Sequence, residues 1–261
     1  MKNLIYQVSV GKPSKLYEHC TRSARFYANR IGCYYLMQSE PRLKIRPDPF
    51  ATGRSREATE RLGYLPIFEK ENAFEYFPEF DSILILDSDI YIRPDAPNIF
   101  EHVNPEVDFA GHVERDGPIL EHYQAKLRNY TNMQYNHEGM RHLFEWEMNN
   151  GADFYNMGMM FLNKSIYKYL NGQTPRQFIR REEFKGFVDG VGPWKWSTDQ
   201  TLLNYWIKKE RMKVHNLDFK WNALFTAIDD ISLKNAYFIH FFLKDKLPDR
   251  GENVEQLMAS I

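Results

Sequence analysis

Two aspartates, Asp87 and Asp89, directly follow a short apolar run at residues 82–86 and are separated by one serine. Such a run is typical of a central parallel strand that is buried on both faces. In open α/β sheets, ligands bind at the edge formed by the carboxyl ends of the strands. Two carboxylates this close repel each other unless a positive charge lies between them, and a hard divalent cation supplies that charge. We therefore expect a metal site here, and the alternative is a solvated turn.

A cation bound by these aspartates would act on the phosphates of a ligand. A nucleotide diphosphate carries about two or three negative charges, and a Lewis acid on its oxygens stabilises the leaving group when a sugar–phosphate bond breaks. The net charge of the chain is −1, so no overall basic field attracts nucleic acid or acidic membranes. Local groups must hold any anionic ligand, and the pattern points to transfer chemistry at a sugar–nucleotide bond.

A second group of polar residues lies near the end of the chain. His240 follows an apolar stretch, and Lys246 comes shortly after it. A neutral imidazole could be the third metal ligand, and an ammonium could bind diphosphate as a point charge. The alternative is a half-buried strand histidine followed by surface lysines. A histidine ligand favours Mn²⁺ over Mg²⁺ as the cofactor.

The opening of the chain is expected to form a β-α-β unit. Residues 4–10 and 33–38 are apolar enough for strands, and between them apolar side chains recur at spacings of three and four, as on one face of a helix. Ser14 is a plausible N-cap of this helix, and Gly32 ends it. This order favours an α/β fold with a mostly parallel, Rossmann-like central sheet flanked by helices.

The remainder of the chain continues the alternation of strands and helices. No stretch rich in Gly, Ser or Pro divides it, so we expect one domain over residues 1–261. A polar insertion is expected around 115–150, and Ser197 is expected to cap a helix. The other expected elements are strands at 107–113, 156–162 and 236–242, helices at 54–61 and 67–77, and a loop at 41–53.

Composition limits the compartment and the class of protein. The two cysteines, Cys20 and Cys33, do not have the spacing of metal ligands and are too few for a disulfide framework, which indicates a reducing environment. The first ten residues are too few and too polar for a signal peptide. The longest apolar run, residues 236–243, is far shorter than the ~20 residues of a spanning helix. We expect a cytoplasmic enzyme without a transmembrane segment.

Four segments, taken in order, resemble the pattern of glycosyltransferase family 8. They are Asp87-Ser-Asp89, Asn156-Met-Gly158, Asp199-Gln200 and the stretch from His240 to Lys246. The family has a D-x-D after a central strand, an Asn-x-Gly strand, Asp-Gln at a helix start, and a terminal His-x-x-Gly-x-x-Lys-Pro-Trp. The resemblance implies a GT-A-type fold and a metal-dependent glycosyltransferase that uses a nucleotide-sugar donor, with a UDP-sugar favoured.

The resemblance also implies a role for each matching residue. Asp87, Asp89 and His240 would bind the metal, and Asp199 and Gln200 would face the donor sugar near its anomeric carbon as the catalytic pair. The acceptor would be a glycan or another hydroxyl compound, on the side of the insertion, and the product would retain its anomeric configuration. The residues expected to bind the donor are Val8, Ser9, Lys70, Ser88, Asn156, Gly158 and Lys246.

Some positions depart from the family or have a second explanation. Leu243 stands where the family has glycine, and Pro248 is displaced without a tryptophan beside it. Asp199 and Gln200 also suit a plain helix start, in which Ser197 and Gln200 form a capping box. Lys70 could instead lie on a solvated helix face.

Two other functions share parts of this pattern. A sugar nucleotidyltransferase of related fold would open with a Gly-rich basic phosphate loop, and residues 8–12, Val-Ser-Val-Gly-Lys, match that poorly. A non-catalytic protein that binds a sugar nucleotide or a glycan would not need an intact metal site.

Overall fold

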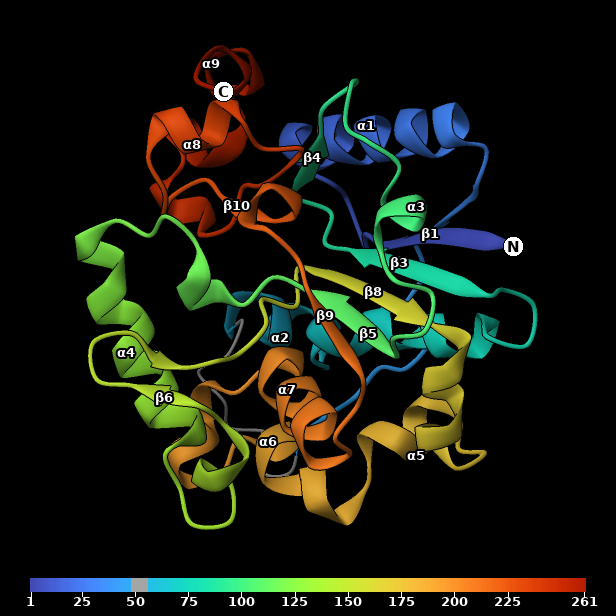
Figure 1. The fold of residues 1–261 in the computed structure, drawn as a ribbon, viewed down its shortest axis with the longest axis vertical. Helices are drawn as coiled ribbons and strands as arrows, with labels where there is room; N and C mark the ends of the chain where they lie inside the picture. The colour runs from blue at the N-terminus through green and yellow to red at the C-terminus, as the bar shows by residue number, and fades with distance from the viewer. Residues whose placement is uncertain (48–55) are drawn as a thin grey trace.

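The computed structural model describes residues 1–47 and 56–261, and its centre is a six-stranded sheet of order β2-β1-β3-β8-β5-β9 (Figure 1). Five strands run parallel, and β8 runs antiparallel to its neighbours β3 and β5. Helices flank this sheet, so the predicted α/β fold is confirmed. The strands are β1 (Asn3–Val8), β2 (Tyr34–Gln38), β3 (Ser82–Leu86), β5 (Phe109–Gly111), β8 (Met159–Asn163) and β9 (Val214–Asn216).

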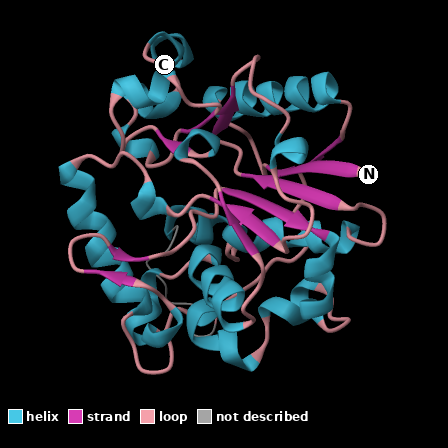
Figure 2. Ribbon diagram, viewed as in Figure 1, coloured by secondary structure: helices cyan, strands magenta, loops and turns pink. Residues whose placement is uncertain are grey.

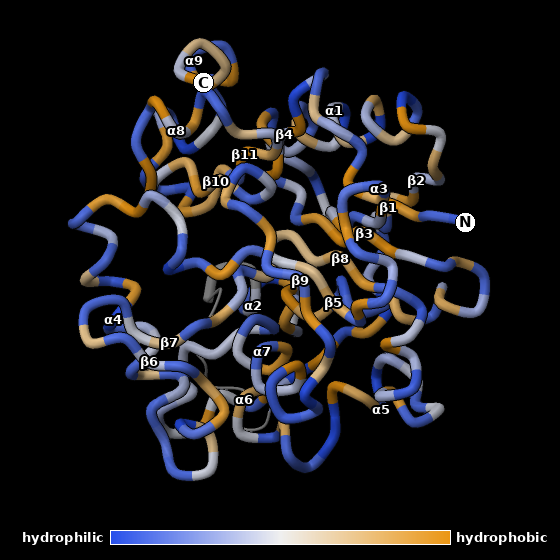
Figure 3. The backbone as a smooth tube through the Cα atoms, viewed as in Figure 1, coloured by the Kyte–Doolittle hydropathy of each residue, from blue (hydrophilic) through white to orange (hydrophobic). Residues whose placement is uncertain are grey.

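Strand β3 is buried along its whole length, as its apolar sequence predicts. Successive side chains of a strand point to opposite faces. Ile83 and Ile85 pack into one hydrophobic cluster, whereas Leu84 and Leu86 pack into another. Figure 3 shows that apolar residues concentrate along the central strands while the outer loops are mainly hydrophilic. Because both faces of β3 are covered, only its carboxyl end is available to a ligand.

The two faces of the sheet are covered by different helices. Helix α1 (Lys15–Ile31) packs on one face, and α7 (Asp199–Lys209) packs on the other (Figure 1). Ser14 caps α1 by accepting a hydrogen bond from the Tyr17 N–H, and Gly32 ends it in the left-handed conformation, so both predictions are confirmed. The other helices are α2 (Arg56–Leu62), α3 (Ile99–His102), α4 (Glu121–Tyr135), α5 (Pro175–Ile179), α6 (Lys185–Asp189), α8 (Asp230–Lys234) and α9 (Val254–Ala259).

A smaller sheet of order β10-β11-β4 adjoins the carboxyl end of β3. Its strands are β4 (Ile90–Ile92), β10 (Ala223–Leu224) and β11 (Phe238–His240). β4 starts directly after Asp89, and β11 pairs antiparallel with it so that His240 lies opposite Ile90. This pairing places His240 beside the two aspartates despite their separation in the sequence.

The segment at 115–150 contains α4 and leads into a small hairpin of β6 (Trp146–Glu147) and β7 (Gly151–Ala152), as Figure 2 shows. Its partly helical character agrees with the sequence. The single domain over 1–261, and the role of this segment as an acceptor-side insertion, stay predictions. In the described residues no helix is both long and apolar enough to cross a membrane.

Several predicted boundaries are wrong, mostly where the chain bends towards the ligand edge. The strand predicted at 156–162 begins only at Met159, because Asn156 Oδ1 accepts the Gly158 N–H in a local turn. The strands predicted at 107–113 and 236–242 shorten to three residues each. Thr198, and not Ser197, caps α7 by accepting from the Gln200 N–H.

The segment between β2 and β3 also differs from its prediction. The helix expected at 67–77 is a 3₁₀ helix, η1 (Pro66–Tyr76), and most of its middle is buried. Residues 48–55, which belong to the predicted loop and to the start of the helix predicted at 54–61, lie outside the described residues.

Candidate active site

Asp87, Asp89 and His240 converge at the carboxyl end of β3. Each offers one potential ligand atom, and these atoms all lie within 4.8 Å of one another. His240 Nε2 is 3.3 Å from Asp89 Oδ1 and 3.9 Å from Asp87 Oδ2. In the part of the chain that the structure describes, no other group of three His, Cys, Asp or Glu residues is so arranged. The structure thus brings together the three predicted ligands.

The chemistry of this donor set fits a divalent cation. Asp89 Oδ1 is buried and faces His240 Nε2 at 3.3 Å, and no other hydrogen-bond donor of the described residues reaches it. A cation between this oxygen and the nitrogen lone pair would satisfy both atoms. Carboxylate oxygens and an imidazole nitrogen are common protein ligands of divalent cations. Asp87, Asp89 and His240 could therefore hold such an ion.

The neighbouring charges shift the pKa values of Asp87 and His240. Burial raises the pKa of Asp87, the Lys70 ammonium lowers it, and the charge of Asp89 raises it further, so that the result lies above the ordinary value. Burial alone would lower the pKa of His240, but the Asp89 and Asp87 carboxylates outweigh burial and raise it. The site has an excess of negative charge that favours binding of a cation.

Lys70 links the metal-binding edge to the start of α7. Its Nζ lies 2.8 Å from Asp87 Oδ1 and 2.8 Å from Asp199 Oδ2, and it donates a 2.7 Å hydrogen bond to the Met157 carbonyl. The side chain is only 11% exposed, so the alternative of a solvated helix face is wrong. Burial would lower the pKa of Lys70, but Asp199 and Asp87 raise it above the ordinary value and keep the ammonium charged.

An open cleft runs over these residues in two halves of about 550 and 580 Å³. Both halves share Tyr17, Lys70, Asp87, Asp89, Asp199 and Lys244. The first half is further lined by the end of β1 at Val8 and Ser9, and by Ser88, whose hydroxyl donates to the Val8 carbonyl. The second half is further lined by Asn156, Gly158, Gln200 and His240 and by an aromatic wall, defined as Tyr123, Tyr130 and Phe242. Except for Lys246, every predicted site residue lines this cleft.

Gln200 is held from two sides. Its Oε1 accepts a hydrogen bond from the Met157 N–H, and its Nε2 donates to the Tyr130 hydroxyl at 3.2 Å. Asp199 beside it is almost completely buried and paired with Lys70. The start of α7 therefore does more than cap a helix, because it presents two oriented polar side chains to the cleft.

The segment after β11 differs from its prediction in one respect. Lys246 is exposed and lies outside the described lining of the cleft, whereas Lys244 and Arg250 belong to it. Leu243 has φ +58°, a left-handed conformation that glycine adopts more easily. The backbone thus keeps a glycine-like bend at the position where the family has glycine. A role of Lys246 at the diphosphate stays a prediction.

Some functional candidates were not predicted from the sequence. Asn222 is completely buried, and its Oδ1 lies 3.2 Å from His240 Nδ1. Glu114 is buried and accepts hydrogen bonds from Tyr123 and Asn156. No pattern marks either residue, since each acquires its neighbours only through folding. Lys244 could have been predicted, because it lies shortly before Lys246 in the same basic turn after His240.

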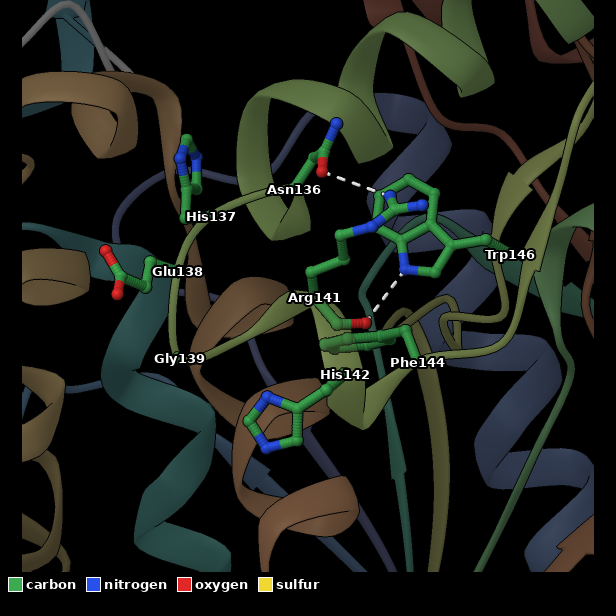
Figure 4. Close-up of a pocket in the computed structure, with 8 residues that line it drawn as sticks. All are labelled: Asn136, His137, Glu138, Gly139, Arg141, His142, Phe144 and Trp146. Atoms are coloured by element: carbon green, nitrogen blue, oxygen red, sulfur yellow. Dashed lines mark hydrogen bonds between the residues drawn. The ribbon is translucent and has the colours of Figure 1, made fainter.

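A separate surface hollow lies at residues 136–146 (Figure 4). Arg141 crosses it, donating to Asn136 Oδ1 at 3.1 Å and lying over the ring of Trp146. None of its lining residues contributes to the cleft at Asp87.

Comparison with known proteins identifies the family and the fold. The family model for glycosyl transferase family 8 matches residues 36–246. A search of curated proteins by sequence finds no match. Two crystal structures show the same fold at low identity. A glycosyltransferase involved in glycosylation of the major capsid of PBCV-1 has a TM-score of 0.57 at 16% identity, over 98% of this chain and 100% of the other.

The second crystal structure is the galactosyltransferase LgtC in complex with donor and acceptor sugar analogs. It has a TM-score of 0.56 at 12% identity, over 98% of this chain and 94% of LgtC. The family match covers most of the chain, including the D-x-D, the Asn-x-Gly turn, the start of α7 and His240. The chain therefore belongs to glycosyltransferase family 8.

Proposed function

We propose that this glycosyltransferase transfers a hexose from a nucleotide-diphosphate donor, with UDP-sugars favoured, to a hydroxyl acceptor, and that the reaction depends on a divalent cation. The observation that supports this most strongly is the convergence of Asp87, Asp89 and His240 where the two halves of the cleft meet. A ligand that extends from one half into the other passes Asp87 and Asp89, which line both halves, and His240 lines the second half beside them. When bound, the cation would neutralise the diphosphate and stabilise the leaving nucleotide.

The half of the cleft at Val8, Ser9 and Ser88 is proposed to bind the nucleotide. Strand β1 ends there, and ligands of open α/β sheets bind at such ends. Lys244 and Arg250 line the same half. Their positive charges suit the diphosphate, and Lys246 is a further candidate for this contact.

The donor sugar is proposed to lie between Lys70, Asp199 and Gln200. Lys70 fixes the Asp199 carboxylate, and Tyr130 together with the Met157 N–H fixes the Gln200 amide. Polar groups oriented in advance stabilise charge that develops at the anomeric carbon, because they need no reorganisation during the reaction. As the family resemblance implies, the product would retain its anomeric configuration.

The aromatic wall of the other half is proposed to bind the acceptor. Tyr123 and Phe242 pack edge to face at 5.7 Å, and Leu127 lies among them. Aromatic rings provide apolar surface against which the face of a sugar can pack. A glycan or another hydroxyl compound could thereby approach the donor sugar from the side opposite the nucleotide.

A thermal-shift panel of nucleotide sugars, each with and without Mn²⁺, tests the proposal. A ligand that binds the native state raises the melting temperature by mass action, so the donor should stabilise the protein only when Mn²⁺ is present. Donors that pass this test are then assayed for transfer or slow hydrolysis. Stabilisation independent of metal would contradict the cation site, and binding without any turnover would favour a non-catalytic sugar-nucleotide binder.

A further inference from the structure

Asn222 lies beneath the lining of the cleft and contacts two residues of that lining, Asn156 and His240. It has no solvent exposure and is not among the described residues that line the cleft. Its Nδ2 lies 3.0 Å from Asn156 Oδ1 and 3.3 Å from the Asn156 carbonyl, and its Oδ1 lies 3.2 Å from His240 Nδ1. Asn222 directly precedes β10, which pairs with β11, so the small sheet holds it beside His240.

A series of hydrogen bonds connects the Gly158 N–H, through Asn156 and Asn222, to His240. The direction of each bond in this series follows from one donor whose role is fixed. The Gly158 N–H can only donate, and it points at Asn156 Oδ1 at 3.0 Å. Asn156 must therefore present its oxygen there, which leaves its Nδ2 to donate to the Glu114 carboxylate at 2.9 Å. Asn222 faces this same oxygen and the Asn156 carbonyl, and two acceptors require an NH₂ group opposite them.

The amide oxygen of Asn222 consequently faces His240 Nδ1. An oxygen acceptor requires that Nδ1 carry a hydrogen, so in the neutral ring Nε2 is left with its lone pair. Nε2 is the nitrogen that lies 3.3 Å from Asp89 Oδ1. We infer that Asn222 and Asn156 are positioning residues that fix the Nδ1-protonated tautomer of His240 and keep Nε2 available to a cation. The use of this tautomer rests on the metal site proposed above.

Most of the hydrogen-bonding capacity of the Asn156 side chain is used within the protein. The family resemblance implies that Asn156 lies beside the donor sugar, and in the structure its side-chain oxygen accepts two hydrogen bonds while its nitrogen donates one to Glu114. Only one amide hydrogen is left for a ligand. The Gly158 N–H thus fixes the orientation of the Asn156 amide, and the main role of Asn156 is to fix the orientation of the Asn222 amide.

The packing around the imidazole supports the same conclusion. A β-carbon at position 158 would lie 2.6 Å from His240 Nδ1 and 3.0 Å from Asn156 Oδ1, and closer still to His240 Cε1. Gly158 is needed here because the ring lies against its backbone. The ring is thus held on one side by this backbone and at Nδ1 by Asn222.

The tautomer can be measured directly in the metal-free protein. Long-range ¹H–¹⁵N spectra distinguish the protonated from the unprotonated ring nitrogen, at a pH where the His240 signals no longer titrate. In the wild-type protein we expect the proton on Nδ1, and in Asn222→Ala a mixture or the Nε2-protonated form. A wild-type His240 with its proton on Nε2 would overturn the inference without the need for any variant.

Mn²⁺ binding provides a second readout. Loss of a residue that orients a metal ligand typically lowers affinity 10–100-fold, so we expect about this loss in Asn222→Ala when free Mn²⁺ is counted by electron paramagnetic resonance. Asn163→Ala is the matched control, because Asn163 is a buried, hydrogen-bonded asparagine at the opposite end of β8. Equal losses in both variants would indicate general destabilisation and overturn the positioning role.

The two readouts also separate this inference from the proposed function. If the wild-type protein bound no Mn²⁺ while His240 carried its proton on Nδ1, the hydrogen-bond chain would be supported and the proposed metal site contradicted. If Mn²⁺ bound equally well to wild type and Asn222→Ala, the metal site would stand and the positioning role would fail.

Discussion

Replacing Lys70 with methionine removes a buried positive charge and keeps an unbranched side chain of similar length. The ammonium of Lys70 lies 2.8 Å from carboxylate oxygens of both Asp87 and Asp199. The side chains of Lys70 and Asp199 are only 11% and 8% exposed, so water from the cleft compensates little for the lost cation. The variant therefore leaves the Asp199 carboxylate buried without a counter-charge.

Removal of one partner from a buried ion pair costs about 3–5 kcal/mol of unfolding free energy. We expect the lower end of this range, because Asp87 is 35% exposed and keeps part of its hydration. For a chain of this size, about 3 kcal/mol corresponds to a fall in melting temperature of roughly 6–12 °C. Lys164→Met is the control, since Lys164 is exposed and donates one 3.3 Å hydrogen bond to the Pro78 carbonyl. It should cost about 0.5 kcal/mol or less.

Urea unfolding followed by tryptophan fluorescence, in the presence of a chelator, measures both variants. The double variant Lys70→Met/Asp199→Asn should recover part of the loss, because it also removes the unpaired charge. A Lys70→Met protein within about 1 kcal/mol of wild type would refute the reasoning, since that is the worth of an exposed ion pair.

Three further predictions concern neighbouring residues. Gly158→Ala should displace the His240 ring and weaken Mn²⁺ binding by about tenfold or more; unchanged affinity in paramagnetic resonance would contradict the close packing. Burial raises the pKa of Glu71 well above its ordinary value, so the native state keeps a proton that the unfolded chain releases. Its contribution to stability is complete below the ordinary glutamate pKa and is lost as pH rises towards the folded value. Urea unfolding at a series of pH values measures this decline in the free energy of unfolding, and Glu71→Gln should remove the part that is due to Glu71. An identical pH dependence in wild type and Glu71→Gln would disprove this prediction. Lys244→Ala should raise the KM for the proposed UDP-sugar donor more than Lys246→Ala does, because Lys244 lines the cleft and Lys246 does not. A larger rise in Lys246→Ala, measured from initial rates, would indicate that Lys246 makes the diphosphate contact.

Features that depend on one element could be predicted from the sequence. Helix α1 begins at the Ser14 cap and ends at Gly32, as the local chemistry requires. The apolar run of β3 is buried on both faces, and this burial places Asp87 and Asp89 at a ligand edge. In both cases the signal and its structural consequence lie within a few residues of each other.

Features that depend on distant contacts could not be predicted in this way. Lys70 follows no apolar or charge pattern and was named only through the family resemblance; its burial could not be predicted, because it depends on Asp87 and Asp199, which approach it from two other elements. Asn222 precedes a two-residue strand that exists only through pairing with β11. The N-cap of α7 is Thr198 and not the predicted Ser197, because serine and threonine both cap helices and the local sequence does not distinguish the two positions.

The dependence of donor turnover on Mn²⁺, compared between wild type and Asp89→Asn, tests the central claim most directly. The variant removes one ligand charge, and Asp95→Asn, which changes an exposed aspartate after β4, is the control. We predict that wild type and Asp95→Asn turn over the donor only with Mn²⁺, and that Asp89→Asn folds normally but loses this activity. Metal-dependent turnover by Asp89→Asn at the wild-type rate would contradict the claim.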